Sequence, residues 1–221
     1  MMDAFLSFIQ SNKAYFEAAN AISSAINLVV WCIALAFLAV AIRRHRIDSV
    51  SLGPINIKMK EEAVSAAASA ARAWPGQAVD VARIRATVDK AFSPETANNL
   101  TGKAVLWVDD RPANNALVVR ALRRLLLDVE QVTDSEAAVA AMQRRPFDLV
   151  ISDMGRGTNM RAGYDLLVWL RKTGSQVPYF IFSSDDKPEF RREAKELGAQ
   201  LSTNNMLELI DHVVASLGGK P

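Results

Sequence analysis

Cysteine and histidine are scarce in this 221-residue chain, and their scarcity excludes several kinds of site. Cys32 is the single cysteine, so a disulfide framework and a cysteine-based zinc site are both excluded within one chain. The two histidines, His45 and His212, are far apart and have no partners at ligand spacing. Glycine-rich phosphate loops and Ser-His-Asp sets are also missing. We therefore do not expect an enzyme.

A strong charge of either sign is missing as well. The 26 lysines and arginines nearly balance the 24 acidic residues, and the formal net charge is +2. Positive residues are spread along the chain rather than gathered into a basic patch, so no nucleic-acid partner is expected. Aromatic residues occur throughout, which argues against a disordered chain.

Charged residues are absent from residues 18–42, and this segment is strongly apolar. About 20 apolar residues are enough for a helix to cross a bilayer. Arg43, Arg44 and Arg46 follow at once, so the positive-inside rule places the C-terminal side in the cytoplasm. We expect a single-pass protein of the inner (cytoplasmic) membrane, with residues 1–17 outside or interfacial. The alternative is a buried core helix, although such helices usually have one polar face.

Residues 43–102 have the character of a juxtamembrane linker. Apolar and polar residues alternate over residues 55–60, which predicts a short strand. Alanine-rich residues 61–74 and the periodic residues 79–92 predict two helices, and residues 95–102 predict a loop. An alanine-rich helix beside a membrane anchor suits close packing against a second copy of the chain. Homo-oligomerisation and a plain spacer are the two interpretations.

From residue 103 onward, apolar segments alternate with helical ones. The expected strands are residues 104–108, 129–132, 148–152, 178–182 and 200–202. The expected helices are residues 114–127, 135–145, 163–172, 188–197 and 206–217. This alternation predicts an α/β fold over residues 103–217, a doubly wound five-stranded parallel sheet, with residues 218–221 as a tail.

Parallel sheets of this kind place their sites at the carboxyl ends of the strands. Polar residues at these ends are Asp109, Asp110, Asp153, Ser183 and Thr203. Three of them are carboxylates on neighbouring strands, and like charges so close raise one another's pKa unless a cation intervenes. Oxygen ligands in small number favour Mg²⁺. A carboxylate beside Mg²⁺ can act as a nucleophile toward a phosphoryl group, and Ser183 can hydrogen-bond the product.

Three motifs give this half of the chain a family resemblance. VLWVDD at residues 105–110, FDLVISDM at residues 147–154 and PYFIFSS at residues 178–184 resemble a response-regulator (CheY-like) receiver domain. Gly163 and Tyr164 fall between the second and third motifs, as in that family. The order and spacing of the motifs span nearly the whole predicted domain.

The resemblance implies a role for each matching residue. Asp109 and Asp110 match the acidic pair that holds Mg²⁺ together with Asp153. Asp153 matches the phosphoacceptor, and Ser183 matches the hydroxyl residue that follows the phosphoryl group when the domain switches. The phosphoryl group comes from a histidine kinase or a small phosphodonor.

The chain departs from the family after the fifth strand, where receivers usually carry a lysine followed by proline. Here the residues are Thr203, Asn204 and Asn205. The missing lysine is a positive partner for the phosphoryl oxygens, and Arg156 or Arg161 can substitute for it.

Two functions follow from the same aspartates. In the first, this is a membrane-anchored signalling protein that accepts a phosphoryl group on Asp153 with Mg²⁺ and regulates a partner. In the second, it is a pseudo-receiver that scaffolds or assembles as a membrane-bound oligomeric effector without phosphorylation.

Overall fold

The computed structural model describes residues 53–74, 78–185 and 187–219, and these lie in one compact unit, Ser51–Pro221. The predicted segments at residues 1–17 and 18–42 lie outside the described residues. Within the described part of the chain, no helix combines the length and the apolar character that a bilayer crossing requires.

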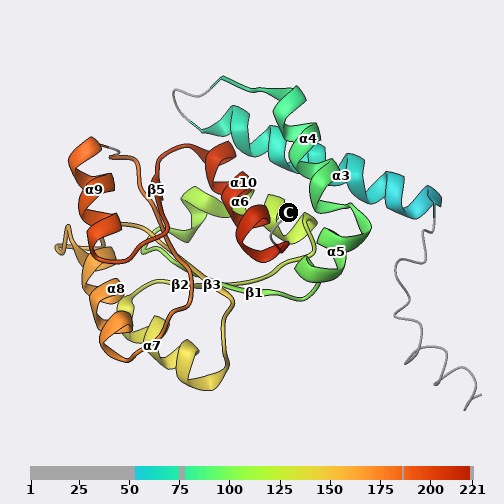
Figure 1. Ribbon diagram of the computed structural model, residues 1–221. Helices are drawn as coiled ribbons and strands as arrows, with labels where there is room; N and C mark the ends of the chain where they lie inside the picture. The colour runs from blue at the N-terminus through green and yellow to red at the C-terminus, as the bar shows by residue number, and fades with distance from the viewer. Residues whose placement is uncertain (1–52, 75–77, 186, 220–221) are drawn as a thin grey trace, which may run out of the picture. The chain divides into compact units, whose positions relative to one another are not determined.

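A five-stranded parallel sheet lies at the centre of this unit (Figure 1). Its strands are β1 (Ala104–Val108), β2 (Asp128–Val132), β3 (Leu149–Ser152), β4 (Tyr179–Phe182) and β5 (Leu201–Thr203). Their order is β2-β1-β3-β4-β5, and every neighbouring pair is parallel. The predicted doubly wound sheet is confirmed, and each predicted strand end lies within one residue of its observed position.

Helices follow the strands on both faces of the sheet. They are η1 (Pro112–Asn115), α6 (Ala116–Arg124), α7 (Ser135–Arg144), α8 (Ala162–Lys172), α9 (Pro188–Glu196) and α10 (Met206–Leu217). Asp134 caps α7, because its side chain accepts a hydrogen bond from the backbone N–H of Ala137 at 2.7 Å. Gly198 follows α9 with a φ of 97°, a conformation that ends helices and favours glycine.

Side chains from alternate strand positions build two separate cores, one on each face of the sheet. Val105 and Trp107 of β1 point into the core shared with α6 and α10. Leu106 and Val108 point into the core shared with α7, α8 and α9. Both faces are covered, so β1 and β4, in the interior of the sheet, are apolar at every position rather than at every second one.

Among the described residues, three further helices precede the sheet: α3 (Gly53–Ala73), α4 (Val81–Ala91) and α5 (Pro94–Leu100). The predicted strand at residues 55–60 is wrong, because these residues form the start of α3. The alternation there is too short to overcome the helix propensity of the alanines that follow. The predicted loop at residues 95–102 is also wrong. Pro94 at the first helical position starts α5, and its buried Leu100 anchors that helix in the core.

The alanine-rich face of α3 packs within the chain. Its buried alanines are Ala63, Ala66, Ala67, Ala68, Ala70 and Ala71, and they share a core with α6 and α10. Glu62 and Arg124 form an ion pair at 2.7 Å that joins α3 to α6. The small side chains let the two helices approach closely, so this face is covered by the chain itself rather than left for a second copy.

Enlarging one of these alanines tests the α3 packing. Ala70 is 1% exposed, so Ala70→Leu is expected to lower the free energy of unfolding by about 1–3 kcal/mol through overpacking. Ser65 lies on the exposed side of the same helix, and Ser65→Leu is the matched control, with an expected change within about 0.5 kcal/mol. Urea denaturation measures both, and equal effects would contradict the docked position of α3.

Candidate functional site

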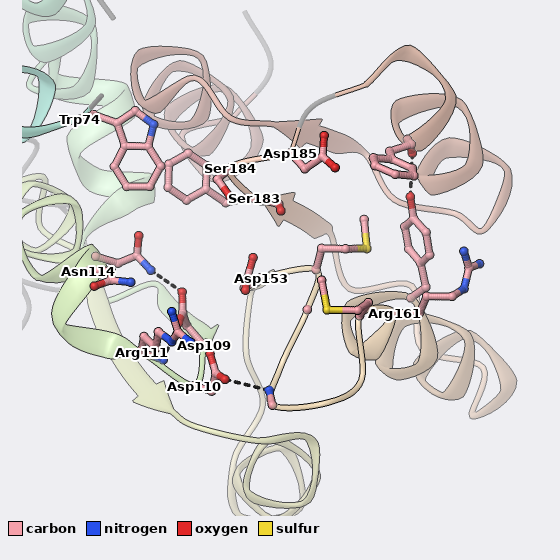
Figure 2. Close-up of a pocket in the computed structure, with 18 residues that line it drawn as sticks. Trp74, Asp109, Asp110, Arg111, Asn114, Asp153, Arg161, Ser183, Ser184 and Asp185 are labelled. Atoms are coloured by element: carbon pink, nitrogen blue, oxygen red, sulfur yellow. Dashed lines mark hydrogen bonds between the residues drawn. The ribbon is translucent and has the colours of Figure 1, made fainter. Parts of the chain in front are cut away.

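The structure brings the three predicted carboxylates together at the carboxyl edge of the sheet. Asp109 and Asp110 follow β1 and Asp153 follows β3, and these strands are neighbours in the sheet. One carboxylate oxygen from each residue lies within 4.8 Å of the other two (Figure 2). Three hard oxygen ligands at this separation fit a divalent cation such as Mg²⁺.

Asp109 is held in place by the turn that follows it. Its carboxylate accepts a 2.7 Å hydrogen bond from the backbone N–H of Arg111 and a short one from the buried side chain of Asn115. Its own N–H donates to Val132 O of β2 at 3.0 Å. Both carboxylate oxygens are therefore oriented before any ligand binds.

The loop between β3 and α8 provides the opposite side of the site. The backbone N–H of Gly157 donates a 2.8 Å hydrogen bond to the Asp110 carboxylate. Gly163 lies against the base of this loop, and a Cβ there would come within 2.6 Å of Asp153 O and 3.1 Å of Met154 Cα. The family motif includes Gly163, and the structure gives a physical reason for glycine at this position. Any side chain there would displace the backbone that carries Asp153.

Burial and repulsion raise the pKa of two carboxyls of this cluster, Asp153 and Asp109. Burial is the main cause that raises the pKa of Asp153 to about 6; the nearby charges of Asp109 and Asp110 act in the same direction, and the Met154 N–H and Arg156 act against it. Burial also raises the pKa of Asp109, although the hydrogen bond from the Arg111 N–H opposes it. The site is thus prepared for a cation, which would relieve this repulsion.

A cavity of about 490 Å³ opens above the carboxylates. Ser183, directly after β4, lines it together with Asp153, as predicted for the switch hydroxyl. Its backbone N–H donates to Thr203 O at 3.2 Å, which ties the end of β4 to β5. Trp74 lies at the rim beside Phe182, with ring centroids 4.6 Å apart.

The two arginines predicted as replacement cations occupy other positions. Arg156 is buried and does not line the cavity; its guanidinium donates to Ser152 Oγ and Asp153 O, at 2.7 and 3.0 Å. It also donates to Ser135 Oγ and Ala162 O, so it fastens the Asp153 loop to α7 and α8.

Arg161 does line the cavity, but its guanidinium pairs with the Glu193 carboxylate of α9. It also lies 4.9 Å from the centre of the Tyr164 ring, in a cation–π contact. Arg161 therefore bridges the site loop to α9.

The end of β5 lacks the positive charge that receivers place there. Thr203 forms a short hydrogen bond to the Glu208 carboxylate and accepts one from the Asn205 N–H at 2.9 Å. Asn205 in turn caps α10 by accepting from the Glu208 N–H at 2.9 Å. A helix cap replaces the lysine-proline pair at this position.

Sequence reasoning missed four contributors to the site: Trp74, Arg111, Asn115 and Gly157. Arg111 directly follows the acidic pair, so its position at a strand end is a signal that could have indicated it. The other three reach the site through tertiary packing and carry no local signal.

The family comparison agrees with this geometry. Residues 105–202 match the family model described as the response regulator receiver domain. The chain contains a receiver domain. The match begins in β1 and ends in β5, so Asp109, Asp110, Asp153 and Ser183 all lie inside it.

Relatives of the receiver domain occur in much longer signalling proteins. The sensor protein EvgS of Escherichia coli strain K12 is 30% identical over 124 residues, which are 56% of this chain and 10% of that protein. EvgS of strain O157:H7 is 29% identical over 98 residues, 44% of this chain and 8% of that protein. The chain spans about a tenth of the length of these curated relatives.

Solved structures similar to the receiver domain come from several organisms. Chemotaxis protein CheY4 of Vibrio cholerae is 24% identical with a TM-score of 0.48, covering 53% of this chain and 100% of its own. The receiver domain of Francisella response regulator 1452 is 21% identical with a TM-score of 0.47, covering 53% of this chain and 97% of its own. Response regulator TrrA of Thermotoga maritima is 21% identical with a TM-score of 0.45, covering 52% of this chain and 99% of its own.

The raised pKa of Asp153 predicts how stability depends on pH without divalent cations. The folded pKa of about 6 exceeds the unfolded value, so protonation favours the folded state. The contribution of Asp153 to the free energy of unfolding is expected to fall as the pH rises from about 4 to about 6 and then to level off. Asp153→Asn is expected to raise it at about pH 7.5 by about 1–2 kcal/mol, after allowance for solvent screening.

Urea denaturation at about pH 4.5 and pH 7.5 measures this effect. The exposed Asp165 of α8 is the matched control, and Asp165→Asn is expected to leave the pH dependence unchanged. If Asp153→Asn kept the pH dependence of the wild type, burial and repulsion would not raise the pKa of Asp153 in the folded protein.

Gly163→Ala tests the close approach beneath Asp153. The added Cβ must displace Asp153 O, so the free energy of unfolding is expected to fall by about 1–3 kcal/mol. Gly155→Ala is the control, since a Cβ there meets nothing nearer than 3.5 Å. Thermal denaturation distinguishes them, and equal stability of the two variants would show that the loop relaxes without cost.

Proposed function

We propose that this protein is a membrane-anchored receiver protein in which Asp153 accepts a phosphoryl group. Residues 18–42 cross the inner membrane once, residues 1–17 lie outside and the receiver domain faces the cytoplasm. The apolar run and the arginines that follow it support this topology. The observation that carries the phosphoacceptor assignment is the convergence of Asp109, Asp110 and Asp153 at the edge of the sheet.

Asp153 has the chemistry that phosphoryl transfer requires. A carboxylate oxygen of Asp153 forms a bond to phosphorus while the phosphorus–nitrogen bond of a phosphohistidine, or the phosphorus–oxygen bond of a small acyl phosphate, breaks. The leaving imidazole or carboxylate takes the electron pair. Mg²⁺ held by Asp109, Asp110 and Asp153 would neutralise charge on the transferring oxygens.

The surrounding residues keep the acceptor in position. Arg156 and Gly163 hold the backbone of Asp153, and the Asn115 side chain orients Asp109. Ser183 lines the cavity from the neighbouring strand, which supports a role in donating its hydroxyl to a phosphoryl oxygen. The partner is a histidine kinase or another signalling protein, and the similarity to a sensor protein supports such a partner.

A second function has an observation in its favour. Thr203 is bonded to the acidic Glu208 where receivers carry a lysine, and the Arg156 guanidinium is directed away from the cavity. A site without a positive charge at the end of β5 favours a pseudo-receiver that recruits a partner or assembles at the membrane without phosphorylation.

Beryllofluoride, a mimic of the phosphoryl group, separates the two functions. The full chain in detergent is titrated with beryllofluoride in the presence of Mg²⁺, and heat release is recorded. Saturable binding that requires Mg²⁺, is lost in Asp153→Asn and persists in the control Asp165→Asn supports the phosphoacceptor. A folded protein with no binding would reject it and leave the pseudo-receiver.

A further inference from the structure

Trp74 belongs to the acidic cavity although it lies outside the segment that matches the receiver family. It directly follows α3, and its backbone N–H donates to Ala70 O and Ala71 O at 3.1 and 3.3 Å. The cavity that Trp74 lines is the one lined by Asp109 and Asp153. Figure 2 shows the indole of Trp74 among the residues that line the cavity, on the same side as Ser183 and Ser184.

Trp74 also begins a row of aromatic rings that leads to β4 and β1, two of the three strands that carry site residues. Its ring lies 4.6 Å from that of Phe182, the last residue of β4 and the neighbour of Ser183. Phe182 meets Trp107 of β1 edge to face, with centroids 5.8 Å apart. Trp107 is buried and precedes Asp109 by two residues, so a movement of either strand end reaches Trp74 through direct contacts.

The helix that carries Trp74 is docked by small side chains. Alanines make up most of the face that α3 buries against α6, and each buries a single methyl group. The Glu62–Arg124 ion pair is partly exposed and adds little. Two further ion pairs, Lys60–Asp89 and Glu61–Arg85, join α3 to α4 and are also partly exposed. A helix docked by alanines buries less apolar surface per residue than one anchored by leucines, so it can be displaced more readily.

A second route connects the same helix to the site. α6 starts directly after Asn115, whose side chain bonds the Asp109 carboxylate. α3 therefore contacts the site at two places, through α6 at Asp109 and through Trp74 at the end of β4. α3 is also the first described element after the apolar run at residues 18–42.

We propose that Trp74 forms a closing wall of the phosphoryl pocket, so that ligand binding at Asp153 and docking of α3 on the receiver domain stabilise each other. This inference rests on the proposed phosphoacceptor function. An indole at the rim excludes water from one side of the pocket, and charges in a drier site interact more strongly. Because coupling is reciprocal, a ligand that binds better with Trp74 in place must also hold α3 more firmly.

The regulation that follows differs from that of a free-standing receiver. Occupation of the pocket tightens α3 on α6, and release of α3 opens the pocket. Displacement of α3 is therefore expected to weaken ligand binding.

Calorimetry and hydrogen exchange on the full chain in detergent test the coupling together. Beryllofluoride with Mg²⁺ is titrated into wild type, Trp74→Ala, Trp74→Phe and Trp169→Ala. Trp169 is a partly exposed tryptophan of α8 outside the cavity, so it is the matched control. Trp74→Ala is expected to weaken binding about fivefold or more, while Trp74→Phe and Trp169→Ala stay close to wild type.

Hydrogen exchange needs no variant and measures the reverse effect. In wild type, beryllofluoride with Mg²⁺ is expected to slow amide exchange in α3. Binding of equal affinity in Trp74→Ala, with unchanged exchange in α3, would overturn the coupling and leave the phosphoacceptor intact. No binding in wild type would overturn the phosphoacceptor function and the coupling with it.

Discussion

Repulsion among Asp109, Asp110 and Asp153 is the constraint around which the carboxyl edge of the sheet is built. Their oxygens lie within 4.8 Å of one another in a partly buried site, where like charges are costly. Each carboxylate is kept there by a different device. Asp109 is bonded by the Arg111 N–H and Asn115, Asp110 by the Gly157 N–H, and Asp153 sits on a backbone fixed by Arg156. An arrangement that concentrates negative charge in this way is useful when a cation or a positively polarised phosphorus atom completes it.

The helices before the sheet change what the receiver domain can do. α3 covers α6, and Trp74 at its end reaches the rim of the cavity. The cavity at the carboxyl edge is therefore built from two parts of the chain, and only one of them matches the receiver family. Under the proposed coupling, occupation of the cavity and docking of α3 depend on each other.

Much of the fold was predictable because the signals were local and physical. β1, β3 and β4 are buried at every position, so they are apolar throughout apart from Ser152 and stand out from the amphipathic helices. The carboxylates were predictable for the same reason, since the end of a buried parallel strand is where such a sheet places its chemistry.

The errors arose where tertiary contacts decide the outcome. Residues 55–60 alternate like a strand, yet they continue the helix of the alanines after them. Arg156 follows Asp153 by three residues, but the loop directs its guanidinium toward Ser135 and Ala162 instead of the cavity. Trp74 reaches the pocket only because α3 docks on α6, and no local pattern encodes that contact.

Phosphorylation of Asp153 itself is the central claim, and intact-mass spectrometry tests it most directly. The full chain is incubated with a small acyl phosphate and Mg²⁺, and a second sample also contains a chelator. The mass of the protein is recorded in both samples. The account predicts a mass increase of one phosphoryl group that requires Mg²⁺ and is absent in Asp153→Asn. An unchanged mass in the folded wild-type protein, or the same increase in Asp153→Asn, would contradict it.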